Sequence, residues 1–129
     1  MIKIILIISF GASFGAVLRY FLSMFFNSII PSFFLGTLIV NLLGGFLIGI
    51  LFGLFSVYSE LNESWKLLLM TGFCGSLTTF STFSLELFVL FQDEKFLMVL
   101  LTFLSHFIGS IVLTVVGWFF INWCSQLFS

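Results

Sequence analysis

Apolar residues run along this chain in four long blocks that are separated by short polar segments. The blocks cover about residues 4–26, 33–57, 65–91 and 96–123. Each block is long enough to cross the roughly 30 Å hydrocarbon layer of a bilayer, which takes about 20 residues of α-helix. The pattern therefore predicts an all-α membrane protein with four transmembrane helices per subunit, in a single domain over residues 1–129.

The composition agrees with a membrane protein and excludes several other classes of protein. Hydrophobic residues make up 61% of the 129 positions and charged residues only 7%, so a charged, water-exposed surface cannot be built from this chain. The formal net charge of −1 gives no attraction to nucleic acid, and we expect none as a partner. The single histidine, the few acids and the cysteines Cys74 and Cys124 form no recognisable catalytic set, so we do not expect an enzyme.

The start of the first block has features of a signal peptide. The apolar run nevertheless continues through Arg19 without a cleavage motif of small residues. We therefore expect this block to be retained as the first membrane helix.

The positive charges do not favour one orientation in the membrane. With four spans, Lys3 and Lys66 lie toward one side, whereas Arg19 and Lys95 lie toward the other. Orientation usually follows an excess of Lys and Arg on the cytoplasmic side, and this chain has almost none. We therefore expect dual topology, in which copies insert both ways up and pair as an antiparallel homodimer with a two-fold axis in the membrane plane.

Glycines four residues apart suggest close contacts between helices. Gly11 and Gly15 form one pair, and Gly45, Gly49 and Gly53 extend the spacing along the second block. Small residues at this spacing let helix backbones approach where lipid provides no hydrophobic drive. The spacing alone does not decide between a real helix interface and a chance repeat.

Polar side chains at membrane depth need a partner or a function, because burial without a hydrogen bond is costly. Arg19, near the far end of the first helix, could anchor that helix by snorkelling or form an electropositive vestibule for anions. Thr37 and Asn41 share one face of the second helix, where the Asn41 amide could join helices or donate hydrogen bonds to an anion. Glu86 lies well away from the loops, and its carboxyl could be protonated, hydrogen-bonded or paired.

The fourth block carries a polar residue at every fourth position, namely Thr102, His106, Ser110 and Thr114. One such hydroxyl usually bonds back to its own helix, but four residues on one face favour a lined path. His106 by itself would more often be a satisfied interior histidine than a ligand or a proton relay.

The third block contains the segment GFCGSLTTFSTF, residues 72–83, which interrupts an otherwise apolar run. Gly72 and Gly75 weaken a helix, and the hydroxyl residues that follow compete for its backbone hydrogen bonds. We expect the helix to break in mid-membrane, which is tolerated only where the backbone is buried in protein or faces water. Unwound carbonyls there would suit a hard cation, whereas the start of the half-helix near Phe80 would favour an anion.

Phe80 and Phe83 lie above one another on that second half-helix. Because the chain has 21 phenylalanines, lipid-facing or core positions are the ordinary interpretation for any one of them. Ser81 and Thr82 place hydroxyl groups beside these rings, and the edge of a ring carries the positive part of its quadrupole. The segment therefore predicts an anion route lined by ring edges and hydroxyls.

Taken together, these segments resemble the Fluc, or CrcB, family of fluoride channels. The resemblance rests on GAVLRY at residues 15–20, GTLIVN at residues 36–41, the segment at residues 72–83 with Glu86, and the spaced polar residues of the fourth helix. It spans nearly the whole chain. It implies a dual-topology dimer with two parallel pores that exports fluoride passively across the bacterial cytoplasmic (inner) membrane, and a structural sodium ion at the dimer centre.

The resemblance also implies a role for each matching residue. Phe80 and Phe83 would be pore phenylalanines, and Asn41 would be a pore hydrogen-bond donor. The backbone carbonyls of Gly75 and Thr78 would bind the sodium ion. The other matches to the fluoride pathway are Ser81, Thr82, Thr37, Glu86, Arg19 and a polar track of Thr102, His106 and Ser110. Some relatives are expected to carry a tyrosine at the position of Thr102.

Two alternatives to a channel are compatible with four short-looped helices. Small proton-coupled multidrug transporters also have four helices and dual topology, but they share an acid in the first helix, where this chain has Arg19 and no acid. A non-transporting membrane assembly subunit would use the same glycine packing and would pass no ion.

Overall fold

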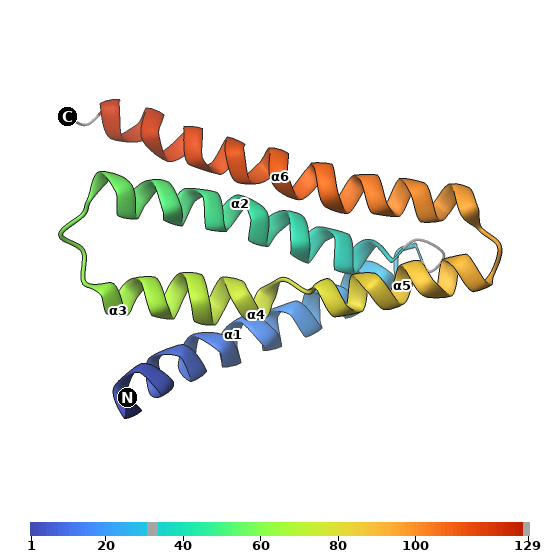
Figure 1. Ribbon diagram of the computed structural model, residues 1–129, viewed down its shortest axis with the longest axis horizontal. Coiled ribbons are helices and arrows are strands. Elements are labelled where there is room, and N and C mark those ends of the chain that lie inside the picture. Colours follow the sequence, from blue (N-terminus) through green and yellow to red (C-terminus); the bar gives the residue numbers. More distant parts are fainter. Residues whose placement is uncertain (31–33, 128–129) are drawn as a thin grey trace.

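The chain folds into a layered bundle of helices, seen in a computed structural model that describes residues 1–30 and 34–127 (Figure 1). Every regular element in these residues is a helix. Four helical segments are long and apolar enough to cross a membrane: Ile2–Asn27, Leu35–Val57, Glu63–Gln92 and Phe96–Leu127. The predicted all-α fold with four membrane-spanning helices is confirmed.

The first, second and fourth spans are single helices. They are α1 at Ile2–Asn27, α2 at Leu35–Val57 and α6 at Phe96–Leu127. The predicted start of the second span, residue 33, lies outside the described residues, as do residues 128–129 of the predicted domain. α6 continues past the predicted end at residue 123, because a fall in hydropathy does not end a helix unless a proline or glycine follows.

The third span is composed of several short helices. It begins with α3, Glu63–Lys66, where Asn62 accepts a hydrogen bond from the backbone N–H of Ser64 at 2.8 Å. It continues as the π-helix η1, Leu67–Cys74, and the short helix α4, Gly75–Leu77.

The predicted break follows directly after α4. Thr78 and Thr79 have extended backbone angles, and α5 then covers Phe80–Gln92. Gly72 and Gly75, which were expected to weaken the helix, both lie within helical segments. The threonines form the break because their hydroxyls and a neighbouring side chain replace the helical hydrogen bonds, as described below.

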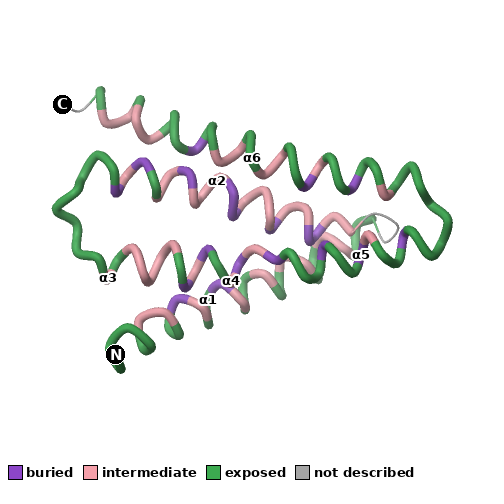
Figure 2. Tube along the Cα trace, viewed as in Figure 1, coloured by how far each residue is buried: buried purple, intermediate pink, exposed green. Residues whose placement is uncertain are grey.

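α2 lies between α6 and the third span, and α1 packs against η1 and α4 (Figure 1). Buried residues concentrate along α2 and the middle of the third span, whereas much of the surface of α1 and α6 is exposed (Figure 2). These exposed surfaces are rich in Phe, Leu, Ile and Val. In a membrane protein such surfaces face lipid.

Glycines permit the close contact between α2 and α6. A side chain at Gly49 would collide with the backbone carbonyl of Thr114, and a Cβ at Gly45 would lie 2.9 Å from the carbonyl oxygen of Ser110. In a membrane the hydrophobic effect does not drive helices together, because lipid is as apolar as the side chains. Small residues promote helix association instead, since they allow close van der Waals contact between backbones.

The glycine spacing therefore marks real helix interfaces, and they lie within one chain. Gly11 and Gly15 are in contact with the third span, and Gly45, Gly49 and Gly53 with α6. These residues consequently give no separate support for a contact between subunits.

The α2–α6 contact predicts a difference between two glycine substitutions. Gly49→Ala should lower the free energy of unfolding by about 1–3 kcal/mol, because the new methyl group meets a backbone atom that cannot turn away. Gly109→Ala is the matched control, since its methyl group would meet only the flexible end of the Leu42 side chain. Thermal unfolding of both purified variants in detergent measures the difference. Equal melting temperatures would contradict this account of the interface.

Candidate functional site

One side chain of α2 holds the backbone at the break. Asn41 accepts a hydrogen bond from the backbone N–H of Thr79 at 2.8 Å, and its Nδ2 donates to the carbonyl oxygen of Thr79 at 3.0 Å. Both backbone groups of Thr79 are therefore satisfied without a helix. The orientation of the amide is fixed, since a flipped amide would place donor against donor and acceptor against acceptor.

The side chain of Thr79 begins α5. Its hydroxyl accepts from the backbone N–H of Thr82 at 3.2 Å and lies 2.9 Å from the Thr82 hydroxyl. Threonine is a favoured N-cap because its oxygen replaces a missing helical acceptor. Thr79 was not among the site residues predicted from the sequence. A hydroxyl residue directly before the expected half-helix at Phe80 is the signal that could have identified it.

The break removes the helical donors of the carbonyl groups that precede it, and for two of these carbonyls the lost donor can be followed to its new partner. In an unbroken α-helix, the Thr79 N–H would bond to the carbonyl of Gly75, and the Thr82 N–H to the carbonyl of Thr78. Here the first N–H goes to Asn41 and the second to the Thr79 hydroxyl. The carbonyls of Gly75 and Thr78 are the two groups that the resemblance assigns to sodium. Hard cations prefer oxygen ligands of this kind.

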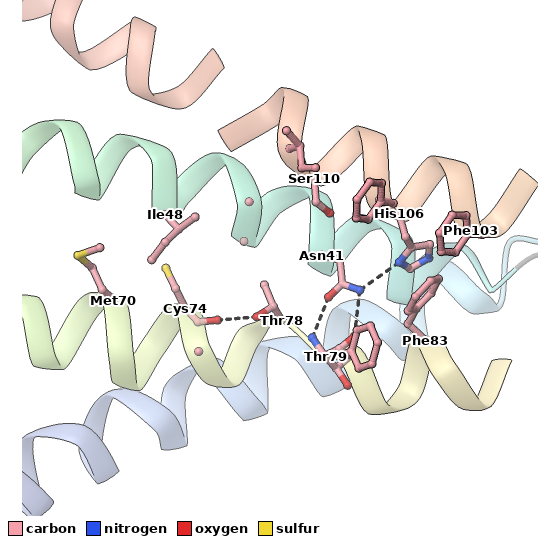
Figure 3. A pocket seen from close by; sticks show the side chains of 16 residues that line it. Asn41, Ile48, Met70, Cys74, Thr78, Thr79, Phe83, Phe103, His106 and Ser110 are labelled. Atoms are coloured by element: carbon pink, nitrogen blue, oxygen red, sulfur yellow. Dashed lines mark hydrogen bonds between the residues drawn. The ribbon is translucent and has the colours of Figure 1, made fainter. Parts of the chain in front are cut away.

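A cavity of about 500 Å³ lies beside the break, lined by residues of α2, the third span and α6 (Figure 3). Its lining is largely apolar, with a few polar groups that converge, as is common in binding sites. The predicted site residues that line it are Asn41, Gly75, Thr78, Phe80, Phe83, His106 and Ser110.

Residues of α2, α5 and α6 form a connected group at this cavity. Asn41 Nδ2 lies 3.1 Å from His106 Nδ1. The His106 ring stacks on Phe83 with 4.5 Å between ring centroids, and the Phe83 centroid lies 5.8 Å from that of Phe80. Phe83 is buried, whereas the Phe80 side chain is 79% exposed in the single chain. We call Asn41, Phe83 and His106 the Asn41 layer.

A second buried layer lies one helical turn away and consists of Thr37, Glu86 and Thr102. The Thr37 hydroxyl donates a hydrogen bond to the Glu86 carboxyl group. α5 runs antiparallel to α2 and α6 (Figure 1). Thr37 and Thr102 precede the α2 and α6 residues of the Asn41 layer, whereas Glu86 follows its α5 residue, so all three lie on the same side of that layer. Glu86 Oε2 is buried and has no hydrogen-bond partner in the described part of the chain.

Several predicted residues lie outside the cavity lining. Arg19 does not line it, and Arg19 Nε is buried with no partner among residues 1–30 and 34–127. Ser81 and Thr82 are exposed near the start of α5. The Thr114 hydroxyl lies 2.9 Å from the carbonyl oxygen of Gly45 and 2.8 Å from that of Ser110, so its one proton lies within hydrogen-bond distance of both acceptors. The expected polar stripe of α6 is therefore divided, since Thr114 joins helices while Ser110 lines the cavity.

Comparison with known proteins places this chain in a family. The model of the family described as CrcB-like protein, Camphor Resistance (CrcB), matches residues 6–118, which include the break and the cavity. A fluoride-specific ion channel FluC from Serratia proteamaculans (strain 568) is 46% identical over 123 residues, which cover 95% of this chain and 97% of that protein.

Other relatives match to a similar extent. The fluoride-specific ion channel FluC of Haemophilus influenzae (strain PittGG) is 45% identical over 125 residues, 97% of this chain and 98% of the relative. That of Acinetobacter baylyi is 44% identical over 126 residues, 98% of this chain and 99% of the relative. The chain is a member of the CrcB-like family.

Proposed function

We propose that this protein is a fluoride-selective ion channel through which fluoride leaves the cell down its electrochemical gradient, which protects the cell from fluoride toxicity. The observation that carries this function is the near full-length similarity to proteins named fluoride-specific ion channels. The cavity beside a helix break supports it, because non-helical backbone at membrane depth accompanies a site or a path. The protein is thus a transport protein and not an enzyme.

Fluoride selectivity would come from the groups that line the cavity. Fluoride must shed water to enter a narrow pore, so the pore has to replace those hydrogen bonds. The Ser110 hydroxyl and the rings of Phe80 and Phe83 lie at the cavity, and ring edges attract anions. Short donors and weak sites favour a small, strongly hydrogen-bonding ion over chloride and still allow its release.

The exposed side of the break supports an antiparallel homodimer. Gly75 and Phe80 are exposed in the single chain, and both line the cavity. Backbone at membrane depth is not stable against lipid, so this face needs a protein cover. A second, inverted copy would supply it, in agreement with the balance of positive charges between the two ends of the spans. The bacterial inner membrane is the proposed location.

The freed carbonyls support a structural sodium ion at the centre of that dimer. Gly75 and Thr78 would each contribute a backbone carbonyl from both copies. Bound sodium would supply positive charge that holds these oxygens together.

Reconstituted protein should pass fluoride and exclude chloride. Liposomes loaded with fluoride should release it when the membrane potential is clamped, because the pathway needs no coupled ion. A fluoride-selective electrode records the fluoride efflux. A chloride-selective electrode records chloride efflux from matched vesicles that are loaded with chloride instead. Chloride efflux as fast as fluoride efflux would contradict selectivity, and the lack of any ion efflux would favour a non-transporting subunit.

The pore phenylalanines can be tested by substitution. Phe80→Ile and Phe83→Ile should each slow fluoride efflux several-fold to about tenfold, because isoleucine has no ring edge to attract the anion and a loss of about 1.4 kcal/mol slows a step tenfold. Phe14→Ile is the control, since Phe14 is exposed on α1 and does not line the cavity. Size-exclusion chromatography should give the same elution volume for all variants. If both substitutions leave efflux at the wild-type rate, the rings have no part in transport.

Dual topology predicts the location of the C-terminus. A reporter fused after the last residue should be active on both faces of the membrane, because oppositely inserted copies coexist. Phosphatase and green fluorescent protein fusions measure the two locations in parallel. Adding three lysines to the loop between α2 and α3 should shift the population toward one orientation. Activity of only one reporter with the unmodified loop would exclude an antiparallel pair.

A further inference from the structure

A groove opens between the start of α1 and the start of the third span. It has a volume of about 340 Å³ and is almost entirely apolar. The N-terminus and α3 lie at the same end of the bundle (Figure 1), so the groove lies at one end of these two spans. It shares no lining residue with the cavity beside the break. The lining consists of Leu6, Ile7, Phe10, Ser64, Trp65 and Leu68.

The groove begins where a close contact between the two helices ends. A Cβ at Gly11 would collide with the carbonyl oxygen of Leu68 and would lie 3.0 Å from the backbone nitrogen of Phe73. The helices therefore touch backbone to backbone at this level. Nearer the N-terminus, α1 carries large side chains instead of glycine, among them Leu6 and Phe10. Both are more than half exposed, so the groove is open to the bilayer.

Lys3 lies on the face of α1 that lines the groove. Lys3, Leu6, Ile7 and Phe10 occupy positions i, i+3, i+4 and i+7, which share one face of a helix. The Lys3 side chain is exposed and makes no salt bridge within the described part of the chain. A lysine stem can follow an apolar surface while its ammonium group reaches the headgroup level of the membrane.

The α3 side of the groove also suits the headgroup region. Trp65 is 54% exposed, and tryptophan is enriched in membrane proteins where the hydrocarbon layer meets the headgroups. Ser64 lines the groove beside it, and a hydroxyl can donate a hydrogen bond to a phosphate oxygen. Polar and amphipathic groups thus meet apolar ones at this end of the groove.

The charged residues of α3 lie on a different face. Lys66 Nζ lies 5.7 Å from the centroid of the Phe55 ring, so this lysine faces α2. Glu63 precedes Lys66 by three residues and shares its face of the helix. Lys3 is therefore the cation of the groove, whereas Lys66 belongs to the contact between α2 and α3.

We propose that this groove binds one acyl chain of an anionic phospholipid, whose phosphate lies at Lys3 and Ser64. The apolar lining matches a hydrocarbon chain. The positive charge of Lys3, which has no counter-ion among residues 1–30 and 34–127, complements an anionic headgroup. A lipid that binds only the folded chain also stabilises it, here where α1 separates from the third span.

Trp65 can report on the groove by fluorescence. Trp118→Phe combined with Trp123→Phe leaves Trp65 as the single tryptophan. The full-length variant is reconstituted in phosphatidylcholine bilayers that contain a small fraction of brominated phosphatidylglycerol or brominated phosphatidylcholine, since bromine quenches tryptophan on contact. Half-maximal quenching should need about fivefold less of the anionic lipid, the factor expected from one lysine near an anionic headgroup. Identical quenching curves for the two lipids would overturn the proposal.

A matched pair of lysine variants distinguishes a site from general charge attraction. Lys3→Gln, made in the same single-tryptophan chain, should remove the fivefold preference. Lys66→Gln removes the same charge at the same end of the spans but on the face toward Phe55, so it should leave the preference unchanged. An equal loss of preference in both variants would mean that the lipid follows surface charge and would refute a site at Lys3.

The same measurement identifies another occupant of the groove. If a second copy of the chain covers it, neither brominated lipid will quench Trp65, and the lipid site is excluded.

Native mass spectrometry provides a test on the wild-type chain. From an equal mixture, wild-type protein should retain more phosphatidylglycerol than phosphatidylcholine, and Lys3→Gln should retain equal amounts. Equal retention by the wild type would contradict the proposal even where the tryptophan variant does not fold. These measurements do not use fluoride, so their outcome is independent of the proposed channel function.

Discussion

The two hydrogen bonds between the Asn41 amide and the backbone of Thr79 hold the third span in its broken form. In the interior of a membrane, water is not present to satisfy an N–H or C=O group that has left a helix, and each unsatisfied group costs several kcal/mol. Asn41 removes this cost for both groups of Thr79 at once. The cap on α5, the free carbonyls of Gly75 and Thr78, and the orientation of His106 all follow from this exchange.

The exchange depends on how closely the helices approach. Asn41 reaches both the break and α6 only because α2 packs tightly between them. Gly44 leaves room for the methyl group of Thr78, and Gly45 and Gly49 let the backbone of α6 come near. The glycines of α2 thus set the distances within which one amide can join three segments of the chain.

Much of this structure could be predicted from the sequence, because a few patterns have direct physical causes. The four spans follow from hydropathy and length, and the break follows from the glycines and hydroxyl residues of the segment 72–83, although the threonines and not the glycines form it. Asn41 was identified because an amide at membrane depth needs partners. These inferences need only local sequence and the properties of a bilayer.

Other features could not be predicted, since they depend on contacts between distant segments. Gly72 was expected to weaken the helix, yet it lies within η1 and allows α1 to approach, with only 2.7 Å from its Cβ position to the Ile8 carbonyl oxygen. The polar stripe of α6 is uniform in the sequence, but its residues face different neighbours. The full use of both Asn41 N–H groups becomes visible only when Thr79 and His106 are placed beside it.

The most direct test of the account concerns the backbone at the break. Solid-state nuclear magnetic resonance of the labelled protein in lipid bilayers gives the backbone chemical shifts of Thr78 and Thr79. The account predicts extended values at these two residues between helical values at Leu77 and Phe80. Helical values at all four residues would show an unbroken span and would contradict the account.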